Sequence, residues 1–391
     1  MTASAELHAL IDLDRLVERT VEFIQTPSVN PVDDEPTATT SETAVTALMA
    51  NHLDRLGFDV AIDHVAPGRP NLTARGVGGD GPRLAFAGHT DTVGIAGCTE
   101  PFSGRIADGR IHGRGACDMK GALAAFIEVA EVLAEDGRSL PGSLSILGIA
   151  DEEHRMIGST ALAASGVDAD LAIVGEPTEL AICRAHLGQF AFSIRTTGVA
   201  VHSSIAEQGV NAIEAMTPVI AMLGDYRADL AAATRHDLCG HGKLNVGLIR
   251  GGAEVSIVPD ACEIGVDRRI VPGETSAGVR VELQERLDAL VADSPGLRVE
   301  LGDAIIDSRP LETAADSPVV AAAQRAMRNL GRADNAGAFP ASTDAPNLGI
   351  PAIVWGPGSL SRAHTIDEYL EIAELAAAAH AYLDAAMHLI G

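Results

Sequence analysis

The sequence predicts an α/β domain into which a smaller α+β domain is inserted. At 391 residues the chain is longer than one typical core accommodates, so two domains are expected. Aliphatic strand-like segments alternate with amphipathic helical segments in the first part, and this pattern returns after residue 306. The middle part has longer alternating stretches that are typical of half-buried strands. We therefore expect residues 1–186 and 307–391 to form one discontinuous domain and residues 187–306 to form the inserted domain.

The first segment is expected to form a sheet with helices on both sides. Helices with an apolar stripe are predicted at residues 12–25, 41–57 and 121–137. Strands are predicted at residues 83–93, 143–150 and 171–177. These strands are nearly continuous aliphatic runs, which is typical of strands buried on both faces.

The inserted domain is predicted to be a two-layer sandwich of strands and helices. Its strand-like stretches are residues 189–204, 243–273 and 297–305. Helical stretches are predicted at residues 209–230 and 274–293. Beyond this domain, a strand at residues 351–356 and a long final helix from about Asp367 complete the α/β domain.

Composition and charge exclude several classes of partner. The formal net charge of −26 argues against nucleic acid and anionic membranes, which bind clustered Lys and Arg. No apolar run approaches the 18 residues of a membrane span, and the N-terminus lacks the pattern of a signal peptide. The cysteine count is odd, at five, and no Cys-x-x-Cys occurs, which indicates a reduced, cytoplasmic protein.

Several predicted strands are followed by polar residues that can bind metal. In open α/β sheets, ligands bind beyond the carboxyl ends of the strands, so these side chains are expected at one edge. Each residue alone has an ordinary explanation as a core histidine, a solvated loop carboxylate or a helix cap. Their recurrence at several strand ends favours a metal site. The candidates are His89, Asp91, Asp118, Glu152, Glu153, Glu176 and His364.

The types of ligand indicate which metals the site would hold. Histidine and carboxylate without thiolate suit Zn²⁺, Co²⁺ or Mn²⁺ better than Ca²⁺ or a structural zinc. Two histidines with three or more carboxylates exceed what one catalytic zinc needs. Two ions about 3.5–4 Å apart, bridged by one carboxylate, would use them all. We therefore expect two divalent metal ions, with Zn²⁺ as the first choice and Co²⁺ or Mn²⁺ as alternatives.

Five motifs, in this order, resemble the M20 metallopeptidase family: "GHTDTV", "GRGACDMKG", "ADEE", "GEPT" and "AHTIDE". Members of that family include acetylornithine deacetylase, succinyl-diaminopimelate desuccinylase, aminoacylase and carboxypeptidase G. The resemblance covers nearly the whole chain, including the inserted domain. It implies a mixed-sheet catalytic domain that binds two metals and an inserted domain that acts as a lid and in dimerisation.

The resemblance also implies roles for the candidate residues. One ion would be bound by His89, Asp118 and Glu176, and the other by Asp118, Glu153 and His364. Asp91 would orient His89 by a hydrogen bond, and Glu152 would be the general base that deprotonates a metal-activated water. The family pattern further implies a cis peptide bond between Asp118 and Met119.

Three residues of the inserted domain are implied to contact the substrate. His202 lies in "TTGVAVHSS", which resembles a family motif whose histidine reaches the partner subunit's active site and helps to hold the oxyanion. The stretch "GVDRRIVPGE" resembles a pattern that selects Arg269 over Arg268 as a clamp for the substrate α-carboxylate. Asn245 occupies the position of a substrate-contacting asparagine.

The resulting functional hypothesis is a cytoplasmic, homodimeric enzyme that removes the acyl group from an N-acyl amino acid. Glu176 stands where family aminopeptidases tend to have Asp, which favours deacylases and carboxypeptidases. Among deacylases, acetylornithine deacetylase or succinyl-diaminopimelate desuccinylase chemistry, both in amino-acid biosynthesis, is the first choice. The alternative enzyme is a dipeptidase or a glutamate-releasing carboxypeptidase. A hypothesis from a different class is that the chain is a non-catalytic binding protein, with a hydrolase fold that has lost its catalytic activity.

Overall fold

The computed structural model describes residues 3–76 and 78–391, and the chain divides into two compact units. The large unit comprises the chain up to Ala185 together with Thr313–Phe339 and Thr343–Gly391. The small unit comprises His186–Glu312 and Pro340–Ser342. The sequence had placed the two boundaries after residues 186 and 306.

A mixed sheet forms the centre of the large unit. Its strands follow the order β1 (Asp59–Ala66), β2 (Arg69–Arg75), β6 (Ser143–Ile149), β3 (Arg83–His89), β7 (Leu171–Val174), β15 (Ala352–Val354) and β8 (Ile182–His186), and β14 (Ala336–Phe339) also pairs with β8. The neighbours β6, β3, β7 and β15 run parallel, whereas β1, β2 and β8 are antiparallel to their partners. The predicted mixed-sheet α/β fold is therefore confirmed.

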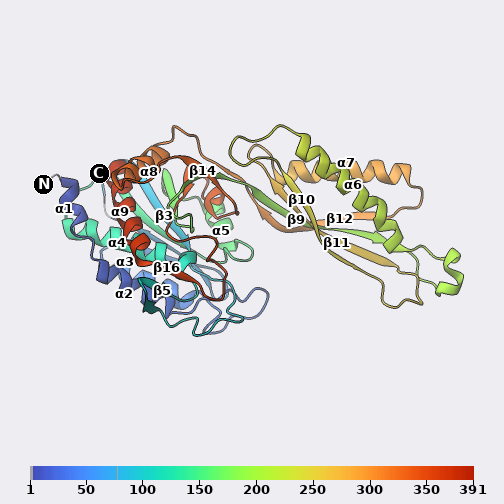
Figure 1. Cartoon of the computed structure of the whole chain (residues 1–391), viewed down its shortest axis with the longest axis horizontal. Coiled ribbons are helices and arrows are strands. Elements are labelled where there is room, and N and C mark those ends of the chain that lie inside the picture. Colours follow the sequence, from blue (N-terminus) through green and yellow to red (C-terminus); the bar gives the residue numbers. More distant parts are fainter. Residues whose placement is uncertain (1–2, 77) are drawn as a thin grey trace. The chain divides into compact units, whose positions relative to one another are not determined.

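Helices and short helical turns cover this sheet (Figure 1). They are α1 (Ala3–His8), α2 (Leu13–Ile24), α3 (Thr43–Arg55), η1 (Ala116–Lys120), α4 (Gly121–Asp136), α5 (Ile157–Ser165), α8 (Pro318–Asn329), η3 (Ala345–Leu348) and α9 (Ile372–Leu389). Helix α4 packs on β3 and β6, and α9 packs on α4 and α8. Within the described part of the chain, no helix has the length and apolar character needed to cross a membrane.

An aromatic cluster joins the centre of the sheet to its helices. The rings of Phe86 on β3 and Phe126 on α4 stack with their centroids 4.7 Å apart. Tyr382 on α9 lies 4.8 Å from Phe126 and meets Trp355 edge to face at 5.4 Å. Few aromatic residues occur in this chain, yet these fully buried rings tie α4 and α9 to the strands.

The prediction of a final helix from Asp367 is wrong at its start. Residues Tyr369–Glu371 form strand β16, which pairs antiparallel with β5 (Arg110–His112), and β4 (Arg105–Ala107) pairs with β5 in the same small sheet. Helix α9 therefore begins only at Ile372. Leu370, at the centre of β16, is buried, so packing against a partner distant in sequence overrides the helical character of this stretch.

The small unit is a sheet covered by two helices. The strands follow the order β10 (Lys243–Gly251), β11 (Ala261–Ile270), β9 (Gly188–Thr197) and β12 (Val299–Ser308), and all pairs are antiparallel. The helices α6 (Ala212–Ala232) and α7 (Ser276–Asp293) pack on this sheet, and the unit also contains η2 (Ser203–Gln208) and β13 (Leu311–Glu312). The predicted two-layer α+β sandwich is confirmed.

Candidate active site

The central parallel strands bring several candidate residues to one edge of the sheet. His89 is the last residue of β3, Glu152 and Glu153 follow β6, and Glu176 follows β7. The glycine before Glu176 allows helix α4 to approach the strand, because a Cβ on Gly175 would lie 2.7 Å from the Cβ of Ala122. This close approach brings Asp118, which precedes α4, beside the ends of the strands.

Asp118 lies between two histidines. Its Oδ1 is 2.9 Å from Nε2 of His89, and its Oδ2 is 3.3 Å from Nε2 of His364. Each oxygen thus faces a different imidazole, as a carboxylate that bridges two ions requires. The peptide bond between Asp118 and Met119 is cis.

Glu153 and Glu176 complete the cluster of candidate ligands. Glu153 Oε1 lies 3.1 Å from Nε2 of His364, and one ligand atom each of His89, Asp118 and Glu153 lie within 4.8 Å of one another. Glu176 Oε2 is 3.9 Å from Nε2 of His89. Its Oε1 is buried and has no hydrogen-bond partner among the residues that the structure describes. Buried polar atoms are nearly always paired, so this free oxygen fits the role of a ligand to a cation.

The electrostatics of the cluster also fit divalent cations. Burial, followed by the nearby charge of Asp118, raises the pKa of Glu176 well above its ordinary value. Hydrogen bonds to Asp118 and Glu153 raise the pKa of His364 to about 10. Carboxylates gathered at one buried place lack sufficient positive charge, and a bound cation would supply it. The imidazole and carboxylate donors present are those that zinc, cobalt and manganese accept.

Asp91 organises the neighbouring turn. Its Oδ1 accepts the backbone N–H of Glu152 and its Oδ2 that of Glu153, each at 3.1 Å. Nδ1 of His89 lies 3.0 Å from the main-chain carbonyl oxygen of Asp91, closer than the carboxylate Oδ1 at 3.5 Å. Nδ1 of His89 therefore donates to the main-chain carbonyl of Asp91, which leaves Nε2 to face Asp118, where it would coordinate a bound cation.

Glu152 has a carboxyl group that is available for proton transfer. Among residues 3–76 and 78–391, this carboxyl takes part in no hydrogen bond or ion pair, although its backbone is held by Asp91. Burial, followed by the charge of Glu176, raises the pKa of Glu152 well above its ordinary value. A fixed but unpaired carboxylate with a raised pKa has the properties of a general base.

A buried network behind Asp91 was not foreseen from the sequence. Asn30 Nδ2 donates to Asp91 Oδ2 at 2.8 Å and to Asp151 Oδ1 at 2.9 Å. Arg69 donates to Asn30 Oδ1 at 2.9 Å and to Glu42 Oε1 at 2.5 Å. All of these side chains are buried. Of these residues, Asn30, Glu42 and Arg69 lie outside the recognised motifs, whereas Asp91 and Asp151 lie within them.

In the small unit, Arg269 and Asn245 lie on the same face of the sheet. Asn245 on β10 pairs in register with Asp267 on β11, and side chains two residues apart on a strand share a face. Arg269 Nε donates to Asp267 Oδ2 at 3.0 Å, and its side chain is 30% exposed. Arg268 points to the opposite, fully buried face, where it pairs with Glu274 at 2.7 Å. Of the two arginines, Arg269 is therefore the one that solvent and small molecules can reach.

His202 is exposed and precedes the short helix η2. Its Nδ1 accepts the backbone N–H of Ser204 at 3.2 Å. The imidazole proton of the neutral side chain is therefore on Nε2, which is free to act as a donor.

Residues 85–388 match the family described as Peptidase family M20/M25/M40, and the chain belongs to this family of hydrolases. It is 35% identical over 377 residues to the acetylornithine deacetylase of Proteus mirabilis, covering 93% of this chain and 94% of that enzyme. It is also 35% identical over 360 residues to the acetylornithine deacetylase of Edwardsiella ictaluri, covering 89% of this chain and 91% of that enzyme.

Solved structures share the fold at lower identity. A tripeptidase from Staphylococcus aureus superimposes with a TM-score of 0.77 at 22% identity, covering 97% of this chain and 98% of that one. An M20 family metallo-carboxypeptidase from Sulfolobus solfataricus gives 0.74 at 20% identity, covering 96% and 99%. A dinuclear metal binding peptidase of the M20 family from Bacillus subtilis gives 0.70 at 17% identity, covering 98% of each chain. These similarities establish the fold.

Proposed function

We propose that this protein is a two-metal amidohydrolase that removes the acyl group from an N-acyl amino acid, with acetylornithine deacetylase chemistry as the first choice. The observation that carries this proposal is the 35% identity to the Proteus mirabilis acetylornithine deacetylase along 93% of the chain. The cluster of His89, Asp118 and Glu153 supports it, because it gathers the donors that such a site needs.

The proposed ligands form two overlapping sets. One ion would be held by His89, Asp118 and Glu176, and the other by Asp118, Glu153 and His364. When bound, the ions supply a water acidic enough to lose a proton near neutral pH and positive charge for the amide oxygen. Zn²⁺ is the proposed metal, with Co²⁺ or Mn²⁺ as alternatives, because the donors are histidine and carboxylate without thiolate.

The protein's own residues carry the proton and orient the reaction. Glu152 takes a proton from the attacking water and delivers it to the leaving amine, which its unpaired carboxyl and raised pKa support. Asp91 keeps Glu152 and Glu153 in place through their backbone N–H groups. His202, with a proton on Nε2, donates to the developing oxyanion in the partner subunit's site.

The proposed substrate contacts are Arg269 and Asn245. The guanidinium of Arg269 binds the α-carboxylate of the amino acid, and the amide of Asn245 adds a hydrogen bond. Their shared face on the sheet and the partial exposure of Arg269 support this assignment. Such a cation gives a chain of net charge −26 a specific place for an anionic substrate.

We further propose a homodimer that forms through the small unit. Strand β10 is at the edge of its sheet, and Leu248 and Ile249 on it are exposed. Val255 and Ile257 in the following loop, and Ile213 on α6, are exposed as well. An exposed sheet edge with apolar side chains is typical of a surface that pairs with another chain. The proposed location is the cytoplasm, on the basis of the odd number of cysteines and the absence of Cys-x-x-Cys.

The proposal is tested by measuring amine release from the purified protein loaded with Zn²⁺ or Co²⁺. The substrates are N-acetyl-ornithine, N-succinyl-diaminopimelate, other N-acyl amino acids and a set of dipeptides, each with and without a chelator. Chelator-sensitive cleavage of N-acetyl-ornithine is expected. Cleavage of dipeptides alone would assign a dipeptidase or carboxypeptidase instead. Inactivity on every substrate, although two metals are bound, would favour a non-catalytic binding protein whose hydrolase fold has lost its activity.

A further inference from the structure

Glu368 is buried and contacts the segment that leads to Asp118. Its Oε1 accepts the backbone N–H of Cys117 at 2.9 Å and of Asp118 at 3.1 Å. Its Oε2 accepts the backbone N–H of Gly115 at 3.1 Å. The main-chain carbonyl of Glu368 accepts the N–H of Gly113, also at 3.1 Å. This one residue therefore accepts four backbone N–H groups, those of residues 113, 115, 117 and 118, in the segment that leads to α4.

The small sheet fixes where Glu368 lies. Glu368 immediately precedes β16, and Tyr369 pairs with His112, the last residue of β5. In an antiparallel pair, the end of one strand lies beside the start of the other. The loop that carries His364 therefore enters this sheet at the place where the segment towards Asp118 leaves it. Glu368 lies at the junction of these two loops.

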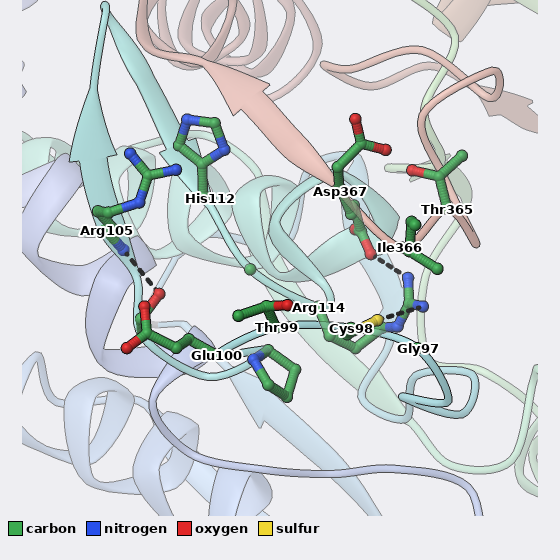
Figure 2. Close-up of a pocket in the computed structure, with 14 residues that line it drawn as sticks. Gly97, Cys98, Thr99, Glu100, Arg105, His112, Arg114, Thr365, Ile366 and Asp367 are labelled. Atoms are coloured by element: carbon green, nitrogen blue, oxygen red, sulfur yellow. Dashed lines mark hydrogen bonds and ion pairs between the residues drawn. The ribbon is translucent and has the colours of Figure 1, made fainter.

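Arg114 balances the charge of Glu368. Its Nη1 donates to Glu368 Oε2 at 2.5 Å, and its guanidinium also donates to the carbonyl of Gly94 at 3.0 and 3.2 Å. Arg114 is buried at one side of a cavity of about 310 Å³, where Figure 2 shows it beside Cys98. A buried ion pair adds little stability by itself, because desolvation offsets the attraction between the charges. A role in positioning explains the pair better than a role in stability.

We propose that Glu368 is a positioning residue for the proposed metal centre. By holding the N–H groups of residues 115, 117 and 118, it fixes the backbone of Asp118 so that both carboxylate oxygens remain free to face His89 and His364. Because it lies four residues after His364, it fixes that histidine's loop relative to Asp118 as well. This inference rests on the proposed function, since Asp118 and His364 act as metal ligands only there.

The substitution Glu368→Gln tests this role with little change in volume. One side-chain oxygen remains an acceptor, but the other becomes an NH₂ group that faces the donors of Arg114 and Gly115. The spacing of Asp118 and His364 should therefore loosen. We expect cobalt affinity, measured on metal-free protein by visible absorption against a competing chelator, to fall about 10–100-fold. Loss of the bridging arrangement should also alter the cobalt absorption spectrum.

Asp367→Asn is the matched control, because it removes one carboxylate charge from the adjacent, exposed residue. Its cobalt affinity and spectrum should equal those of the unsubstituted protein.

If Glu368→Gln does not fold, Arg114→Gln is used instead. It leaves every acceptor of Glu368 in place and should lower the cobalt affinity by a smaller factor. Native-like cobalt affinity and spectrum in folded Glu368→Gln, or in Arg114→Gln where that variant replaces it, would overturn the inference. Failure of the unsubstituted protein to bind two cobalt ions would instead refute the proposed function.

Discussion

Nε2 of His364 lies 3.1 Å from a carboxylate oxygen of Glu153, although 211 residues separate the two in the sequence. Each is held on a loop beyond a strand of the large unit, and neither has a ligand partner nearby in the chain. The candidate metal centre is therefore assembled only when the large unit is folded. In the unfolded chain its donors are dispersed, so metal affinity and folding are coupled.

Metal removal should consequently destabilise the protein. A ligand that binds only the folded state adds about 4 kcal/mol at a thousand times its dissociation constant. We expect a chelator to lower the melting temperature of the metal-loaded protein, and His364→Ala to reduce this difference. Scanning calorimetry with and without chelator measures both effects. Equal melting temperatures for the loaded and chelated protein would contradict the coupling.

Replacing Glu152 with Gln should separate catalysis from metal binding. The amide keeps the size of the side chain but cannot take the proton, and general-base catalysis contributes about 10²–10⁴-fold. We expect kcat to fall by this factor while metal content, measured by mass spectrometry, stays near that of the unsubstituted protein. Glu153→Gln is the matched comparison, because it should lose metal as well as activity. A Glu152→Gln protein that keeps its rate would show that another group is the base.

Arg69 should be important for stability because it is the buried cation of the network behind Asp91. Its guanidinium contacts Glu42 and Asn30 and lies 3.4 Å from Asp151. Removing one partner of a buried ion pair costs about 3–5 kcal/mol, so Arg69→Leu should be strongly destabilising in urea unfolding.

The pH dependence of this effect has a defined sign. Burial raises the pKa of Glu42 to about 7 even with Arg69 present, so the cost of Arg69→Leu should be largest above pH 7. It should shrink as the pH falls and Glu42 takes up a proton. Arg83→Gln, which breaks exposed ion pairs with Asp168 and Asp170, is the control and should have only a small effect on stability. A similar small cost for Arg69→Leu would show that the network is not tightly coupled.

The fold class could be predicted because its signals are local. The strands that end at His89, Ile149 and Val174 are continuous aliphatic runs, which only a sheet covered on both faces can bury. Their polar ends pointed to one edge because parallel strands share a direction. Local sequence was therefore sufficient to group His89, Asp118, Glu153 and His364, which the structure brings together.

Residues that act through tertiary contacts could not be found in this way. Asn30 and Arg69 matter because of what they touch, and neither lies in a periodic pattern or a recognised motif. Glu368 stood in the "AHTIDE" motif, but its bonds to the Asp118 segment depend on the pairing of β16 with β5. That pairing was itself hidden, because Tyr369–Glu371 is short and runs directly into a helix.

Gly175 should be required for the close contact between β7 and helix α4. A Cβ at this position would lie 2.7 Å from the Cβ of Ala122, and a backbone-attached atom of a buried helix cannot easily move away. We expect Gly175→Ala to cost about 1–3 kcal/mol in urea unfolding and to weaken metal binding by displacing Glu176. Gly337→Ala is the control, because a Cβ there meets nothing within 4 Å. Unchanged stability and metal binding in Gly175→Ala would show that the helix adjusts without cost.

His186 should make stability decrease in mild acid. Its side chain is fully buried, and burial lowers its pKa from 6.5 to about 4, while the Nδ1–H donates to the carbonyl of Leu187. Between these two values the unfolded chain binds the proton and the folded chain does not, so stability is lost as the pH falls from 6.5 to 4. The loss amounts to about 3 kcal/mol at 1.36 kcal/mol per pKa unit. His186→Asn keeps a donor but cannot titrate, so its unfolding free energy should decline less over this range. Because the carboxylates titrate equally in both proteins, parallel pH profiles would show that His186 does not carry this loss.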